Sequence, residues 1–212
     1  MLALTVSFAI ANTIAVCAAL SIPANNEQPH GRADRRTCVL SAAALAIPLC
    51  LVALFHLLRA QEAGLFYSMQ YYTLNAFAAA IAVRDVREGV IPNKWLGCMA
   101  GAWVLTLVPR ITGGMGAAHL AGSALGAALG GGLFLAAFAL ARGGLGAGDV
   151  KFMTVIGLYV GFRGVVPSMF FALAAASLAG LGLAAVRKTG MKTRLPLAPF
   201  MWFGACLSLL LL

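Results

Sequence analysis

The sequence contains little charge. Only 10% of its 212 residues are Asp, Glu, Lys or Arg, whereas a soluble domain carries about 25%. Hydrophobic residues make up 62% of the chain, and the mean hydropathy is +0.94. This composition excludes an ordinary soluble globular domain. Because the apolar residues form long runs rather than alternating with polar ones, we predict an all-α polytopic membrane protein embedded in a lipid bilayer.

Several catalytic and metal-binding patterns are also missing. The five cysteines form no CxxC pair and lie mostly in apolar runs, which argues against a zinc site or a disulfide framework. The three histidines lie in separate segments without HExxH, and no GxSxG occurs. The net charge of +9 comes from basic residues spread over several short loops rather than one patch. We therefore expect no metal, no cofactor and no nucleic-acid partner.

The apolar runs predict about eight transmembrane helices. A short run at 150–163 is followed almost at once by the next, so we expect a tight turn around "FRGVVP". Twelve of the 15 Lys and Arg lie in the loops after the first, third, fifth and seventh spans. The positive-inside rule places these loops in the cytoplasm and both termini outside, in a multi-pass protein of the cell inner (cytoplasmic) membrane. The predicted spans are 2–22, 38–58, 64–83, 95–109, 119–141, 150–163, 165–186 and 199–212.

Small residues recur at a spacing of four in several of these spans. Gly122, Gly126 and Gly130 lie in one span, and Gly97 and Gly101 begin another. Such faces allow helices to approach closely in lipid, so we assign these glycines to packing rather than to chemistry.

The chain has only six acidic residues, so each can be weighed. Glu27, Asp34 and Glu62 lie in polar loops, where a solvated charge is the simple explanation. The other three, Asp85, Glu88 and Asp149, all lie on the predicted cytoplasmic face, where Asp85 ends the span at 64–83 and Asp149 begins the span at 150–163. Two facing carboxyl groups that share a proton can activate a water and protonate a leaving amine. Their spacing in the sequence does not by itself bring them together.

Asp149 follows a glycine-rich segment, "GGLGAGD". A backbone without Cβ atoms leaves space in which a peptide substrate could lie. An equally good interpretation is a glycine-rich loop whose acid caps a helix. Intramembrane acids also mark ion pathways, so a non-enzymatic scaffold or a small transporter is an alternative. Against it, both acids lie at one membrane face, whereas a transport path needs polar groups near the midplane.

Three motifs together resemble the type IV prepilin peptidases, a family of GxGD membrane aspartyl proteases. The segment "RDVREGVIPN" is similar to the family's first motif, with Asp85 followed seven residues later by Pro92. The segment "GAGDVKF" looks like the second motif, GxGD followed by Lys151. The segment "RLPLAPF", which contains Pro196, resembles a late proline-rich element of the family. The resemblance covers roughly residues 64–212.

The resemblance implies a fold, an activity and a site. Asp85 and Asp149 would be the catalytic pair of a leader peptidase that acts on prepilin or pseudopilin precursors at the cytoplasmic membrane face. The active-site loops would contain Gly146, Gly148, Lys151, Pro92 and Pro196. Residues 64–212 would form a six-helix peptidase core, preceded by a two-helix segment at 1–63. A GxGD peptidase for preflagellin-like precursors is the alternative within this class.

The chain departs from many bacterial members of that family in one respect. Those members carry a cytoplasmic insert with two CxxC pairs, linked to N-methylation, between their first two spans. Here the corresponding region, "IPANNEQPHGRADRRTC", holds one cysteine and no pair. We therefore expect a peptidase without N-methyltransferase activity.

Overall fold

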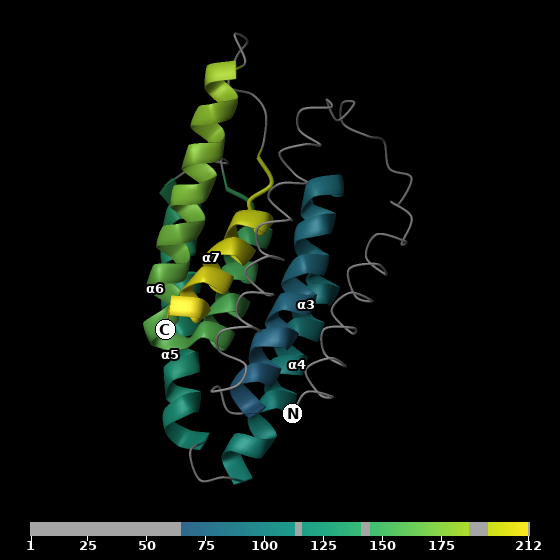
Figure 1. Cartoon of the computed structure of the whole chain (residues 1–212), viewed down its shortest axis with the longest axis vertical. Helices are drawn as coiled ribbons and strands as arrows, with labels where there is room; N and C mark the ends of the chain where they lie inside the picture. Colours follow the sequence, from purple (N-terminus) through teal and green to yellow (C-terminus); the bar gives the residue numbers. More distant parts are fainter. Residues whose placement is uncertain (1–64, 113–115, 141–144, 187–194, 212) are drawn as a thin grey trace.

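The part of the chain that the structure describes is helical. The computed structural model describes residues 65–112, 116–140, 145–186 and 195–211, and these contain no strand. The spans predicted at 2–22 and 38–58 and the loop between them lie outside the described residues. The helices, shown in Figure 1, are α3 (Leu65–Glu88), α4 (Asn93–Thr112), α5 (Gly116–Leu140), α6 (Ala147–Val186) and α7 (Ala198–Leu211). The all-α prediction is confirmed for these residues.

Helix α6 contains two segments that reverse direction at Gly161. This glycine has φ 68° and ψ −176°, outside the helical region. A Cβ built on Gly130 of α5 would lie 3.1 Å from Met153 O and 2.9 Å from Val165 Cγ2. Twelve residues of uninterrupted helix would separate these two contacts by about 18 Å. The chain therefore folds back at Gly161, one residue before the stretch in which the turn was predicted, at a positive φ that favours glycine.

Small residues set the crossing of α5 and α6. A Cβ on Gly126 would contact Gly157 O, and a Cβ on Gly157 would contact Gly126 O, so the two backbones touch at this point. The predicted packing role is confirmed for Gly126 and Gly130. For Gly97 and Gly101 it stays a prediction, because a Cβ on either would meet no described atom within 4 Å.

A buried amide joins α3 to α7. Asn75 Oδ1 accepts hydrogen bonds from Trp202 Nε1 at 2.8 Å and from Cys206 Sγ at 2.9 Å. Asn75 Nδ2 donates to the carbonyl of Tyr71 at 2.8 Å. All of these side chains are buried, and an unpaired amide in such surroundings is strongly disfavoured. This cluster, Asn75 with Trp202 and Cys206, therefore fixes the position of α7 along α3.

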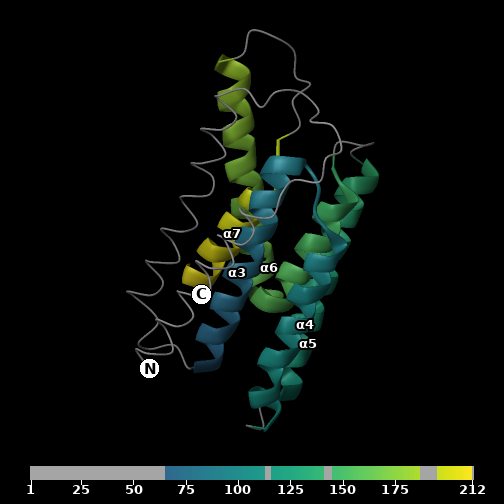
Figure 2. The same ribbon diagram turned by 90° about the vertical axis from the view of Figure 1, so that its right-hand side faces the viewer.

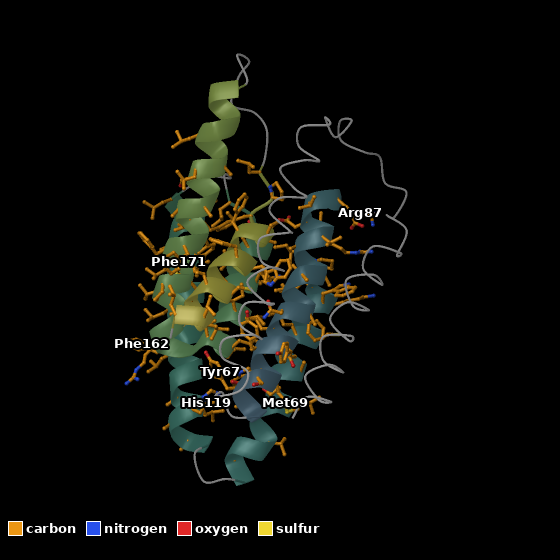
Figure 3. All side chains as sticks on the ribbon, viewed as in Figure 1. Tyr67, Met69, Arg87, His119, Phe162 and Phe171 are labelled. Carbon is orange, nitrogen blue, oxygen red and sulfur yellow. The ribbon has the colours of Figure 1, made fainter. Side chains whose placement is uncertain are left out.

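The outward surface of the bundle is apolar. By length and hydropathy, the segments Gly116–Leu140 and Ala147–Gly182 could each cross a membrane, and Ala198–Leu211 is a shorter apolar helix. Figure 2 shows the second half of α6, in light green, extending beyond the other described helices. Figure 3 shows Phe162 pointing away from the bundle. The large apolar side chains most exposed on α4, α5 and α6 include Leu105, Ile111, Leu135, Leu140, Phe170, Leu178 and Leu181.

Candidate active site

Asp85 lies in the last turn of α3, at the end of the bundle that carries Arg87 and away from the end that carries Tyr67 and His119 (Figure 3). Helix α3 ends just beyond it, because Gly89 adopts φ 65° and its amide bonds to the carbonyl of Asp85 at 2.8 Å. The Asp85 side chain is only 7% exposed. Its Oδ2 accepts a hydrogen bond of 2.9 Å from the backbone amide of Ala198, the first residue of α7.

Burial raises the pKa of the Asp85 carboxyl from the ordinary value of 3.8 to about 6. The backbone amides of Ala198 and Leu197 oppose this rise because they favour the charged form, whereas the charge of Asp149 adds to it. The two acids that the sequence separates by 64 residues therefore lie within electrostatic reach of each other.

Asp149 lies in the first turn of α6, on the opposite side of this site. Its Oδ2 accepts the amide of Gly146 at 3.0 Å, while its own amide donates to the carbonyl of Gly146 at 3.1 Å. The side-chain bond is one half of a helix capping box, in which an acid at the third helical position accepts the amide of the N-cap residue. The helix-capping interpretation is thus correct for Asp149. It does not compete with a chemical role, because Oδ1 takes no part in the cap.

Two contacts bind the loop after α3 to the start of α6. A Cβ on Gly148 would lie 3.1 Å from the Cβ of Ile91, so only a glycine allows the two segments to pack this closely without displacement. Lys151 Nζ donates to Asn93 Oδ1 at 3.0 Å, across the exposed side of the same junction. The loop that follows Asp85 and the helix that carries Asp149 therefore form one packed unit.

The other predicted site residues, Pro92, Pro196, Gly146 and Gly148, lie in the segments next to the two aspartates. The carbonyl of Pro92 accepts the amides of Trp95 and Leu96, so Pro92 is the N-cap residue directly before α4. Pro196 is half-buried in the short segment that leads into α7. Gly146 and Gly148 were expected to leave open space for a substrate. In the structure the Cβ position of Gly146 lies 3.0 Å from Asp149 Oδ2, and that of Gly148 faces Ile91. Both spaces are occupied by this chain's own atoms.

Three residues that shape this site, Ala198, Ile91 and Asn93, are not among those predicted from the sequence. Ala198 acts through its backbone amide, which gives no signal in residue type. Ile91 acts by shape, and any apolar residue in the motif would have looked the same. Asn93 belongs to the quoted "IPN" element, and an amide next to a lysine-bearing motif was the signal available for it. Glu88 pairs with Arg84 on the exposed side of α3 at 3.4 Å.

Within residues 65–112, 116–140, 145–186 and 195–211, no three His, Cys, Asp or Glu side chains gather closely enough to hold a metal ion. The chemistry that this arrangement offers is proton exchange between two nearby carboxyl groups, each with one oxygen bound by a backbone amide.

The described residues thus form a helical bundle that carries two carboxyl groups at one end. Comparison with known sequences identifies the family. A sequence model of the type IV leader peptidase family matches residues 72–185, more than half of the chain and including both aspartates. The chain belongs to this family, which confirms the resemblance seen in its motifs.

A curated relative agrees with this assignment. Over 135 residues the chain is 30% identical to the prepilin leader peptidase/N-methyltransferase of Bacillus subtilis (strain 168). The aligned region covers 61% of this chain and 50% of the relative, so the chain spans about half the length of the curated protein that it matches. No solved structure matches the chain significantly.

Proposed function

We propose that this chain is a membrane-embedded aspartyl endopeptidase. It removes the leader peptide of type IV prepilin-like precursors, pilins or pseudopilins, at the cytoplasmic face of the inner membrane. The observation that carries the proposal is the pair Asp85 and Asp149, held at one end of the bundle so that the charge of one raises the pKa of the other. Membership of the type IV leader peptidase family supports the same reaction.

The two carboxyl groups divide the work of hydrolysis between them. The ionised carboxyl takes a proton from a water molecule, whose oxygen attacks the scissile carbonyl carbon and forms a C–O bond. The protonated carboxyl donates its proton to the peptide nitrogen as the C–N bond breaks. The two groups are unequal, because Asp85 is the more buried and burial raises its pKa to about 6. We assign the proton-bearing role to Asp85 and the role of base to Asp149, which lies at the positive end of α6.

The proposal includes the topology. We propose eight transmembrane helices with both termini outside, a two-helix segment at 1–63 and a six-helix core at 64–212. Helices α3 to α7 supply the core, and the reversal at Gly161 divides α6 into two of its six spans. This orientation puts the end that carries Asp85 and Asp149 in the cytoplasm, which is supported by the basic residues in the adjoining loops.

Leader cleavage in cells tests the activity. The full chain is co-expressed with a precursor that carries a basic leader, a glycine and an apolar helix, and processing is followed on a gel. Asp85→Asn and Asp149→Asn should each abolish processing. Glu88→Gln is the matched control, because Glu88 is an acid on the same helix as Asp85 but is paired with Arg84 on the outside. Full processing by either aspartate variant would refute the assignment.

We also propose that the product is not methylated, because the region before residue 64 holds no CxxC pair. The mass of the mature N-terminus decides this point. A methyl group that depends on this chain would contradict it.

A further inference from the structure

The first turn of α7 carries an amide that its own helix cannot satisfy. The carbonyl of Leu197 accepts the first bonds of α7, from the amides of Phe200 at 3.1 Å and Met201 at 3.0 Å. Ala198 is thus the first helical residue, and its N–H has no acceptor within the helix. A residue from 113 positions earlier in the chain supplies one, because Asp85 Oδ2 lies 2.9 Å from that nitrogen and the bond is buried.

This bond makes the two oxygens of Asp85 different. An amide N–H needs a lone pair, and a protonated carboxyl oxygen is a poorer acceptor than its neighbour. With Oδ2 engaged, a proton that binds Asp85 goes to Oδ1. The same reasoning applies to Asp149, whose Oδ2 is held by the amide of Gly146. In each carboxyl group a backbone amide binds Oδ2, at 2.9 Å in Asp85 and 3.0 Å in Asp149, and the Leu197 amide adds a weaker interaction with the Asp85 carboxyl.

We propose that the backbone amide of Ala198 is a positioning group for Asp85, holding Oδ2 so that Oδ1 is the oxygen that exchanges protons with water and substrate. The inference rests on the proposed function of the aspartate pair and goes further, because it assigns a task to the start of α7. The cluster of Asn75 with Trp202 and Cys206 supports this task, since it fixes α7 against the same helix that carries Asp85.

The charged groups around Asp85 are few. Helix α6 brings Asp149 and Lys151, α4 brings Lys94, and residues 195–211 contain no acid or base other than the buried thiol of Cys206. On α3 itself, Arg84 and Glu88 pair with each other. Of these groups, Asp149 is the one whose charge acts on the pKa of Asp85. A change at the Ala198 amide can therefore be followed through the titration of Asp85, with Asp149 as the coupled partner.

An amide-to-ester exchange removes the donor without changing the side chain. Lactic acid at position 198, introduced by suppression in cell-free synthesis of the full chain, replaces N–H with oxygen. It also weakens the carbonyl of Leu197 as an acceptor. The matched control is phenyllactic acid at position 200, which removes the Phe200 N–H that bonds to that same carbonyl but leaves Asp85 untouched. Both variants loosen the first turn of α7, and only one deprives Asp85 of its donor.

The readouts are leader cleavage and the pH dependence of the thermal unfolding midpoint in mild detergent. In the unmodified chain, the thermal unfolding midpoint should fall as the pH rises through about 6, where Asp85 loses its proton. The ester at 198 should move that change upward by about one pH unit, since it removes a bond to a charged group, and should slow cleavage at least tenfold. The ester at 200 should lower the unfolding midpoint at every pH but should not alter the pH at which the midpoint falls.

A second ester, at Leu197, guards against a misfolded first variant. The Leu197 amide also lowers the pKa of Asp85, but less than the Ala198 amide does, so the shift should be smaller. An unchanged titration with the ester at 198, or a larger shift from 197 than from 198, would overturn the inference and leave the proposed function standing. A shifted titration in a chain that never cleaves a leader would support the role of the amide and refute the peptidase.

Discussion

Replacing Asp85 with Asn should abolish leader cleavage and at the same time stabilise the protein. Asparagine has the shape of a protonated aspartic acid, and its carbonyl oxygen can still accept the Ala198 amide. The reason for the gain is that the wild-type carboxylate is charged above its pKa in a site where it is only 7% exposed. Removing the charge removes this unfavourable burial, whereas it also removes a group that the reaction needs.

The magnitude follows from the pKa of Asp85. In the folded protein it is about 6, against an ordinary value of 3.8. Because the folded-state pKa is raised, the stability contributed by the neutral form is present below the ordinary pKa and is lost as the pH rises through about 6. Above that pH the loss is about 3 kcal/mol. For a chain of this length, such a gain raises the unfolding midpoint by roughly 6–12 °C.

Thermal unfolding in a nonionic detergent at pH 4 and pH 8 measures this effect. Asp85→Asn should unfold at a higher temperature than wild type at pH 8 and at nearly the same temperature at pH 4. Asp149→Asn is the matched comparison: it should also be inactive, and its gain should be smaller, because burial raises the pKa of Asp149 as well but Asp149 is less buried than Asp85. If Asp85→Asn is less stable than wild type at pH 8, burial of the charged carboxylate does not destabilise the folded protein, and the reasoning fails.

Three further outcomes are expected. Gly126→Ala should lower the unfolding midpoint, because its Cβ would meet the backbone of Gly157 and the overpacking costs about 1–3 kcal/mol. Gly132→Ala, whose Cβ would meet nothing within 4 Å, should be neutral or stabilising, and equal midpoints for the two variants would contradict the close crossing. Gly148→Ala should reduce the rate of cleavage roughly tenfold or more with little change in the midpoint, since it pushes against Ile91 and misplaces the two acids; an unchanged rate in a timed cleavage assay would argue against this. Lys151→Met should slow cleavage by less than Gly148→Ala does, because its bond to Asn93 is exposed, and a complete loss in the same assay would indicate a direct chemical role for the lysine.

Much of the described fold follows from simple signals in the sequence. Long apolar runs separated by basic loops predict the helices, and the short run at 150–163 followed at once by another predicts a turn near Gly161, because helix formation in an apolar chain is decided locally. The presence of both aspartates at one end also follows from counting spans between them. These features need only hydropathy and the order of the segments.

The environment of the aspartates could not be predicted in this way. The donor to Asp85 is a main-chain amide 113 residues away, and every residue other than proline has one. The glycines of the GxGD motif suggested open space, but the structure fills it with Ile91 and with the carboxylate of Asp149. Asn75 is different, because a lone amide in an apolar run does signal a buried partner.

The cluster of Asn75 with Trp202 and Cys206 has a consequence for the order of assembly. Helix α3 leaves the ribosome well before α7, and during that interval the Asn75 side chain lacks both donors that later bind its oxygen. Asp85, on the same helix, likewise waits for its amide at Ala198. Both polar groups are satisfied in a single event, when α7 docks. The surroundings of Asp85 and Asn75 are therefore complete only after α7 has docked.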